Sequence, residues 1–164
     1  MVILRAALAS DFPAITEVVA DAFGKSRFDE AGIPARIRAE GAALVELVAE
    51  DAGEIVGHVL FSLMRCQPAR FIAGLGPLAV SPSRQREGIG SALSRQGGEA
   101  CRTQGAEAIV VLGHPTYYPR FGFSAEAAAQ LQSPYHGLPA FMALELQPGA
   151  LDEPLSIDYP AAFG

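Results

Sequence analysis

The spacing of apolar residues along the chain predicts its helices. Across residues 12–23 they recur every three or four positions, the period of an amphipathic helix, and a glycine follows at once. Ser10 and Asp11 precede this segment and offer side-chain oxygens that can cap its first turn. The same spacing predicts a helix over residues 89–104, and a short helix is expected over residues 35–40.

Runs rich in β-branched and aromatic residues predict the strands. These runs are residues 2–5, 44–50, 54–64, 71–80, 108–112 and 140–146, with residues 155–159 as a candidate edge strand. The sequence Asp51-Ala52-Gly53 between the second and third runs predicts a hairpin. A strand, a helix and a second buried strand in the middle of the chain predict a right-handed crossover with a parallel pair. The fold class is therefore mixed α/β.

Two glycines interrupt the helix predicted over residues 89–104. Gly97 and Gly98 each cost a helix interior roughly 1 kcal/mol relative to alanine. A close approach between this helix and the sheet would explain why they stand there.

Length and composition narrow the class of protein. The chain has 164 residues, of which 50% are hydrophobic, and a net charge of −6. This length predicts one domain over residues 1–164. The composition from residue 147 onward, rich in Pro, Gly and acidic residues, predicts a C-terminal tail after a core of about residues 1–146. The acidic balance argues against a nucleic-acid partner, and no apolar run approaches the ~20 residues that span a membrane. Two cysteines without a pairing pattern and the lack of a signal peptide lead us to expect a cytoplasmic protein.

A glycine-containing turn between a predicted strand and a predicted helix is the main candidate for chemistry. It spans residues 78–91 and places Gly88 and Gly90 at the start of the helix. The first turn of a helix has unpaired N–H groups and a positive dipole end, so this arrangement predicts a pyrophosphate site, with Arg84 and Arg86 adding charge. The alternative is a helix start that needs glycine for backbone geometry alone.

Other nucleotide and hydrolase motifs do not fit. Residues 74–79 match a dinucleotide fingerprint, but they lead into a strand where that fingerprint must open a helix. No phosphate loop ending in Gly-Lys-Ser/Thr is present, and neither Ser91 nor Ser94 has the glycine pattern of a nucleophile elbow.

The chain contains two further motifs, at residues 85–90 and 118–123, and the pairs His114-Pro115 and Tyr117-Tyr118 stand before and within the second. The two motifs resemble those of the GNAT acetyltransferase superfamily, and the two pairs resemble a group of bacterial predicted N-acetyltransferases within it. Gln85-Arg86-Glu87-Gly88-Ile89-Gly90 is similar to its acyl-CoA signature Q/R-x-x-G-x-G/A, and Leu78-Ala79-Val80-Ser81-Pro82 precedes it as the family's strand does. Residues 118–123 are similar to the family's Y-x-x-x-G-F. The resemblance implies the GNAT fold, a mixed central sheet splayed between its fourth and fifth strands and flanked by helices.

The resemblance also implies an activity, transfer of the acetyl group from acetyl-CoA to a primary amine of a small molecule or peptide within a ternary complex. It implies that the backbone of Leu78, Ala79 and Val80 pairs with the pantetheine arm. It further implies that the pyrophosphate is held by the amides of Gln85, Arg86, Glu87, Gly88, Ile89, Gly90 and Ser91. Dimers are common in the family, so a homodimer stays open.

Tyr118 has the place of the family's acid, which protonates the leaving thiolate. With a thiol pKa near ~8.5 and a tyrosine pKa near ~10, such a transfer is close to balanced. The alternative for Tyr118 is a core aromatic with a satisfied hydroxyl. His114 is the first candidate for the base that deprotonates the amine, although a structural hydrogen bond would also explain it. Glu46 and His58 are weaker candidates, and no spacing indicates a metal site.

Two other functions remain open at this stage. One is a non-catalytic acyl-CoA-binding module, and the other is acyl transfer to an acceptor other than an amine.

Overall fold

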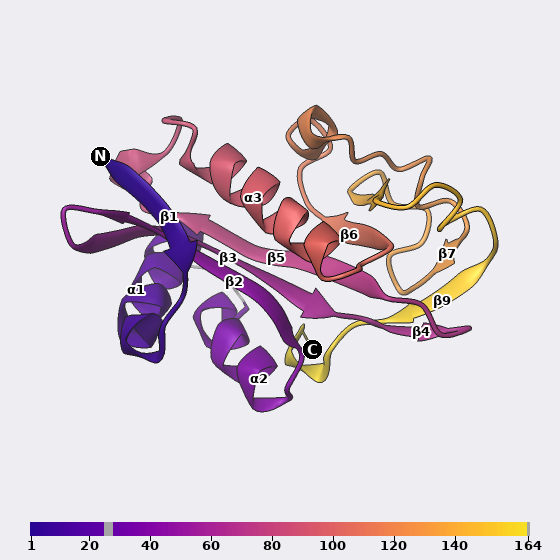
Figure 1. The fold of residues 1–164 in the computed structure, drawn as a ribbon, viewed down its shortest axis with the longest axis horizontal. Helices are drawn as coiled ribbons and strands as arrows, with labels where there is room; N and C mark the ends of the chain where they lie inside the picture. Colours follow the sequence, from indigo (N-terminus) through magenta and orange to yellow (C-terminus); the bar gives the residue numbers. More distant parts are fainter. Residues whose placement is uncertain (25–27, 164) are drawn as a thin grey trace.

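In the computed structural model, which describes residues 1–24 and 28–163, a six-stranded sheet forms the centre (Figure 1). The strand order is β1-β2-β3-β5-β6-β8, and only the neighbours β5 and β6 are parallel within this described sheet. Its strands are β1 (Val2–Ala6), β2 (Ala43–Asp51), β3 (Glu54–Leu63), β5 (Ile72–Val80), β6 (Ala108–Leu112) and β8 (Phe141–Glu145). The predicted mixed sheet and parallel crossover are confirmed.

Helices cover both faces of the sheet. One face carries α3, and the other carries α1 and α2 (Figure 1). The helices are α1 (Phe12–Phe23), α2 (Ile33–Ala39) and α3 (Ile89–Thr103). The short 3₁₀ turns are η1 (Ala9–Asp11), η2 (Glu30–Gly32), η3 (Pro82–Arg84), η4 (Tyr118–Phe121) and η5 (Ala161–Phe163). Proline in its first turn lets α2 begin two residues before the predicted start.

The N-terminus of α1 differs from the prediction. Neither Ser10 nor Asp11 caps the helix with its side chain. The Asp11 carboxylate instead accepts hydrogen bonds from the Leu8 N–H, at 2.7 Å, and from the Arg5 guanidinium, at 2.7 and 2.9 Å. Asp11 therefore ties the turn before α1 to β1.

A close approach between α3 and the sheet explains one of the two helix glycines. A Cβ added at Gly97 would lie 2.1 Å from Cε1 of Phe61 on β3, so only glycine fits there. A Cβ at Gly98 would meet Ile109 at an ordinary 3.7 Å. A close approach between the helix and the sheet therefore explains Gly97, as predicted, but does not explain Gly98.

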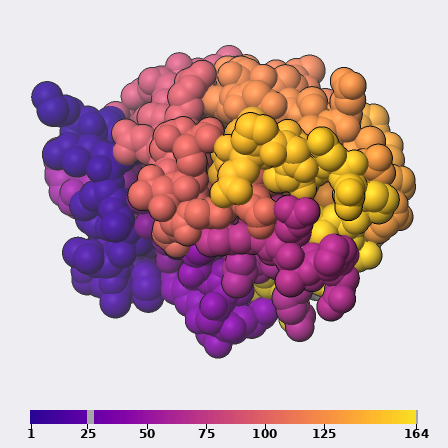
Figure 2. Space-filling view, turned by 45° about the vertical axis from the view of Figure 1, so that its right-hand side comes forward, coloured from indigo at the N-terminus to yellow at the C-terminus, as the bar shows by residue number. Residues whose placement is uncertain are grey.

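A second, smaller sheet contains the C-terminal strand. Its order is β4-β9-β7, with β4 (Arg65–Gln67), β9 (Leu155–Asp158) and β7 (Leu131–Gln132). The expectation of an edge strand near residues 155–159 is wrong, because β9 lies between β4 and β7. Leu155 and Ile157 are buried, and Figure 2 shows the C-terminal residues packed against the rest of the chain.

Candidate active site

The parallel strands β5 and β6 separate toward their carboxyl ends. Their pairing begins at Ile72 with Ala108 and stops at Leu75 with Val111, while β5 continues to Val80. Beyond that point the β6 side of β5 has no strand partner in the described part of the chain. An unpaired strand edge presents free N–H and C=O groups. β5 and β6 are the fourth and fifth strands across the sheet, so the implied splay is present.

A cleft of about 640 Å³ lies at this splay. Its walls are the end of α1, the free end of β5, the turn before α3 and the loop that contains η4. The residues that line it are Ala22, Phe23, Leu78, Ala79, Val80, Arg84, Gln85, Arg86, Gly88, Ile89, Gly90, Ser91, His114, Tyr117, Tyr118 and Arg120. Every predicted site residue except Glu87 is thus brought to one cleft.

The turn before α3 leaves backbone N–H groups at the cleft. Gly88, which precedes the helix, gives no side-chain cap. The first helical hydrogen bond runs from the Ala92 N–H to the Gly88 oxygen. The N–H groups of residues 89–91 therefore have no helical partner, and with the positive dipole end they form an anion site.

The two glycines of the turn have different physical reasons. Gly88 has a φ of 88°, which favours glycine, and nothing lies within 4 Å of where its Cβ would be. That open space is room for a ligand. A Cβ on Gly90 would lie 3.0 Å from the hydroxyl of Tyr117, so Gly90 also makes room for a side chain of the opposite wall.

Side chains of the turn bind one another. Arg84 forms ion pairs with Asp51, at 3.0 Å, and with Glu87, at 3.1 Å. Glu87 is therefore engaged outside the cleft. The Gln85 amide donates a hydrogen bond to the Val80 carbonyl at 3.1 Å, which fixes the turn to the end of β5. Arg86, in contrast, has no ion pair within the described residues.

Tyr118 is held by packing. It is 8% exposed, and its ring makes edge contacts with those of Tyr117 and Phe123, at centroid distances of 5.0 and 5.9 Å. A Cβ at Gly113 would lie 2.4 Å from the Tyr118 ring, so that glycine gives the ring its place. Burial, and to a lesser degree Tyr117, raises the pKa of Tyr118 to about 12. The Tyr118 phenol is therefore a weaker acid than the sequence indicated, because its side chain is buried.

His114 lies at the mouth of the same cleft. Its side chain is exposed, while its carbonyl oxygen accepts the N–H groups of Tyr117, at 3.1 Å, and Tyr118, at 3.4 Å. No hydrogen bond of the imidazole to another described residue is present. The hydrogen bonds of His114 to the following loop are thus made by its backbone carbonyl and not by its ring.

The weaker base candidates form a separate network under the sheet. The fully buried His58 donates Nε2–H to Glu46 at 2.7 Å, and Glu46 also accepts from Arg38. Burial pushes the pKa of Glu46 upward, but the hydrogen bonds from His58 and Arg38 outweigh it, so this pKa lies below its usual value. The network joins α2 to β2 and β3 and does not line the cleft.

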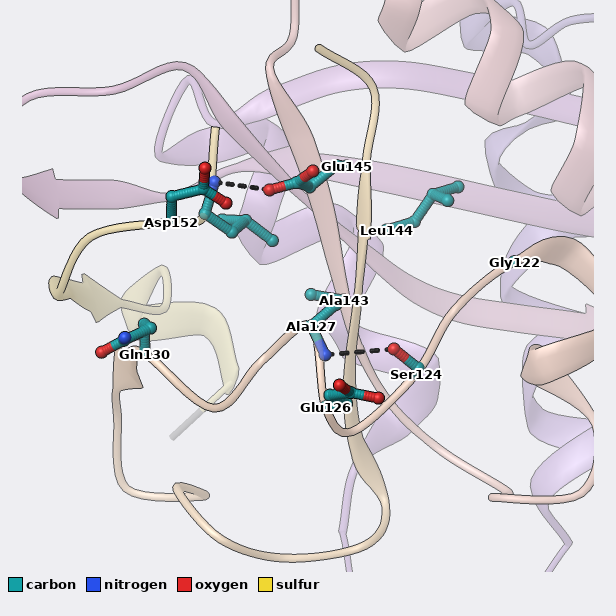
Figure 3. A pocket seen from close by; sticks show the side chains of 10 residues that line it. Gly122, Ser124, Glu126, Ala127, Gln130, Ala143, Leu144, Glu145 and Asp152 are labelled. Carbon is teal, nitrogen blue, oxygen red and sulfur yellow. Dashed lines mark hydrogen bonds between the residues drawn. The ribbon is translucent and has the colours of Figure 1, made fainter. Parts of the chain in front are cut away.

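A second cavity of about 560 Å³ lies beside β8 (Figure 3). Two of its polar side chains are engaged in local structure, because Glu145 accepts the Leu151 N–H at 2.9 Å and Ser124 accepts the Ala127 N–H at 3.0 Å. It contains none of the predicted site residues. Among the described residues there is no cluster of His, Cys, Asp and Glu suited to a metal ion, and no helix long and apolar enough to span a bilayer.

Comparison with known proteins fits this geometry. A sequence profile of the acetyltransferase (GNAT) family matches residues 7–123. The chain therefore belongs to the GNAT acetyltransferase family. Uncharacterized N-acetyltransferase YjhQ of Escherichia coli K12 is 40% identical over 121 residues, which are 70% of this chain and 65%, slightly under two thirds, of YjhQ. Uncharacterized N-acetyltransferase YhbS of the same strain is 30% identical over 137 residues, 82% of this chain and 81% of YhbS.

Solved structures share the whole fold. A GNAT family acetyltransferase from Brucella melitensis in complex with acetyl-CoA has a TM-score of 0.84 and 34% identity, over 100% of this chain and 99% of that one. YhbS from Escherichia coli in complex with CoA has a TM-score of 0.88 and 29% identity, over 99% of this chain and 91% of that one. The splayed mixed sheet is therefore the GNAT fold.

Several cleft residues have no role in the sequence interpretation. Tyr117 and Arg120 flank Tyr118 and Pro119 in the chain, so the second motif pointed to their neighbourhood without indicating their contacts. Ala22 reaches the cleft from the end of α1. Its place in the apolar face of the helix indicated packing, and only the three-dimensional structure shows that the helix ends at the splay.

Proposed function

We propose that this chain transfers the acetyl group of acetyl-CoA to a primary amine of a small molecule or peptide by direct attack in a ternary complex. The observation that carries the proposal is one cleft that joins the uncapped start of α3, the free edge of β5 and Tyr118. The solved relatives that hold acetyl-CoA and CoA support it.

The chain's backbone is suited to bind the thioester substrate in an extended form. The amides around the turn, residues 85–91, would hold the pyrophosphate, and the open space at Gly88 fits such a group. The free edge of β5 at residues 78–80 would pair with the pantetheine arm. The Val80 carbonyl oxygen already accepts a hydrogen bond from the Gln85 side-chain amide. The pantetheine arm would therefore pair with the other backbone N–H and C=O groups of this edge.

Two groups of the chain would act on the reacting atoms. A backbone N–H of β5 in residues 78–80 would donate to the carbonyl oxygen as negative charge develops on it, a contribution typically worth ~3–4 kcal/mol. The Tyr118 hydroxyl would donate to the leaving sulfur. Burial that raises the pKa of this phenol also raises that of a thiol beside it, which keeps the two groups closer in acidity than the tyrosine value alone indicates.

His114 would accept the proton of the attacking amine. An amine of ordinary pKa ~10.4 is almost fully protonated at neutral pH, so attack needs a base or desolvation. His114 stands at the cleft with an exposed ring, whereas His58 is enclosed and bonded to Glu46. The net charge of −6 favours a cationic amine as the acceptor. The free thiols of Cys66 and Cys101 favour a reducing compartment such as the cytoplasm.

An acceptor screen tests this function. The full chain is mixed with acetyl-CoA and a panel of amines and peptides, free thiol is measured with a thiol-reactive dye, and products are identified by mass spectrometry. We expect thiol release that depends on an amine and a product heavier by one acetyl group on nitrogen. Acetyl-CoA binding without turnover across the panel would indicate a binding module instead, and an oxygen-linked product would indicate another acceptor class.

A further inference from the structure

A groove of about 370 Å³ adjoins the cleft between α3 and the η4 loop. Arg120 lines both spaces, so they meet at this residue. Arg95 and Ser94 of α3 and Phe121 of η4 also line the groove. A ligand that begins in the cleft can therefore extend into the groove past Arg120.

The guanidinium groups around these spaces differ from most others in the chain. Ion pairs with carboxylates are formed by Arg5, Arg36, Arg38, Arg70, Arg84 and Arg102. Among the arginines that the structure describes, the ones without such a pair are Arg65, Arg86, Arg95 and Arg120. Three of these four line the cleft or the groove. Unneutralised cations gathered there, in an acidic chain, indicate a ligand with several negative charges.

Aromatic rings hold two of these cations in place. The guanidinium carbon of Arg95 lies 4.9 Å from the Phe121 ring centroid, and that of Arg120 lies 4.6 Å from the Tyr117 ring centroid. The two rings contact each other at a centroid distance of 5.2 Å. Nε of Arg120 donates to the Tyr117 carbonyl at 3.0 Å, which leaves its terminal N–H groups for a ligand. Stacked arginines of this kind are preorganised for bidentate binding of phosphate.

A buried hydroxyl in the groove also lacks a partner. Ser94 is 6% exposed, and its Oγ forms no hydrogen bond within the described chain. A buried hydroxyl without a hydrogen-bond partner is energetically unfavourable unless a ligand or a water molecule forms a hydrogen bond with it. Ser94 therefore provides an observation, independent of the arginines, that the groove receives a polar group.

We propose that Arg95 and Arg120 bind the 3′-phosphate of the adenosine moiety of acetyl-CoA in this groove. The inference rests on the proposed function, in which the turn before α3 holds the pyrophosphate. Acetyl-CoA has one further phosphate, a monoester on the ribose, and a monoester carries close to two negative charges near neutral pH. The Tyr117 hydroxyl lies beside Gly90, and the Tyr117 ring stacks with Arg120. Tyr117 therefore lies between the proposed pyrophosphate site and the proposed 3′-phosphate site. The chain thereby selects acetyl-CoA over the same compound without the 3′-phosphate.

The test compares acetyl-CoA with 3′-dephospho-acetyl-CoA by isothermal titration calorimetry on the full chain. The wild type is expected to bind acetyl-CoA at least about tenfold more tightly, the size expected for charge-assisted hydrogen bonds to a phosphate. Arg95→Ala and Arg120→Ala should each weaken acetyl-CoA binding by about tenfold and leave binding of the dephospho compound unchanged. Arg65→Ala is the matched control, because Arg65 is exposed and unpaired but lies on β4, and it should change neither affinity.

Equal binding of the two compounds by the wild type would overturn the inference while leaving the proposed function intact. Equal weakening of both compounds by the arginine variants would overturn it as well, since the side chains would then serve the diphosphate or the fold. Failure of the wild type to bind either compound would instead refute the proposed function.

Discussion

The variant Tyr118→Phe lacks only the hydroxyl oxygen, so it tests the proposed donation from this hydroxyl to the leaving sulfur. The ring contacts with Tyr117 and Phe123 remain in the variant. No hydrogen bond from the hydroxyl to another described residue is lost. We therefore expect the melting temperature and the affinity for acetyl-CoA to stay the same while the chemical step slows.

The size of this effect follows from the burial of Tyr118. Its pKa of about 12 lies at most ~3.5 units above that of the leaving thiol, the difference from a thiol in water, so complete proton transfer would be uphill by up to ~5 kcal/mol. The hydroxyl should then act mainly as a hydrogen-bond donor to the charged leaving sulfur, worth ~1.5–3 kcal/mol. This predicts a fall in kcat of about 10- to 150-fold, toward the lower end of what a proton-donating side chain usually contributes.

The assay is thiol release under single-turnover conditions, with the enzyme in excess over acetyl-CoA and a saturating concentration of an acceptor found in the screen. Because burial raises the pKa of Tyr118, the phenol stays protonated in the native state, and the ratio of wild-type to variant rates should be constant from about pH 6 to pH 10. Tyr159→Phe is the control, since Tyr159 is another phenol with a buried hydroxyl and no described partner, located outside the cleft. A Tyr118→Phe rate within about twofold of wild type would refute the reasoning.

Three further variants test other parts of the structure. Gly97→Ala should lower the free energy of unfolding by about 1–3 kcal/mol in urea titrations, because its Cβ would collide with Phe61; a stabilised variant would contradict the close approach. Hydrogen bonds from Arg5 and the Leu8 N–H lower the pKa of Asp11 to about 2, so its stabilisation is present above pH ~4 and is lost as pH falls through 2. Asp11→Asn should lower the melting temperature by about 3 °C at pH 7 and by much less at pH 2, where the carboxyl is about half protonated, and an equal loss at both would contradict this. His114→Gln should reduce kcat/KM while leaving the melting temperature unchanged, and an unchanged kcat/KM would eliminate His114 as the base.

Local sequence predicts much of the site because its signals are short-range. Gly88 and Gly90 stand between a strand run and a helix run, and this context alone predicts an anion site at a helix start. Tyr118 followed from a second motif, which is separated from the first by one predicted helix and one predicted buried strand, as in the family. The strands β4 and β7 could not be predicted, because three and two residues are too few to show a period.

Contacts between distant residues account for what the sequence did not indicate. The apolar environment that raises the pKa of Tyr118 and the space that Gly90 leaves for Tyr117 both depend on tertiary packing. The run that predicted β9 gave no information on its neighbours, so an edge strand was expected where a central one occurs. Pairing of Glu87 with Arg84 likewise depends on which way each side chain turns.

A crystal structure of the chain with CoA and a bound acceptor analogue tests the central claim most directly. The account predicts the pyrophosphate within hydrogen-bond distance of the amides of residues 85–91, with the sulfur beside the Tyr118 hydroxyl. A nucleotide bound elsewhere, for example in the cavity beside β8, or a sulfur that lies away from Tyr118, would contradict it.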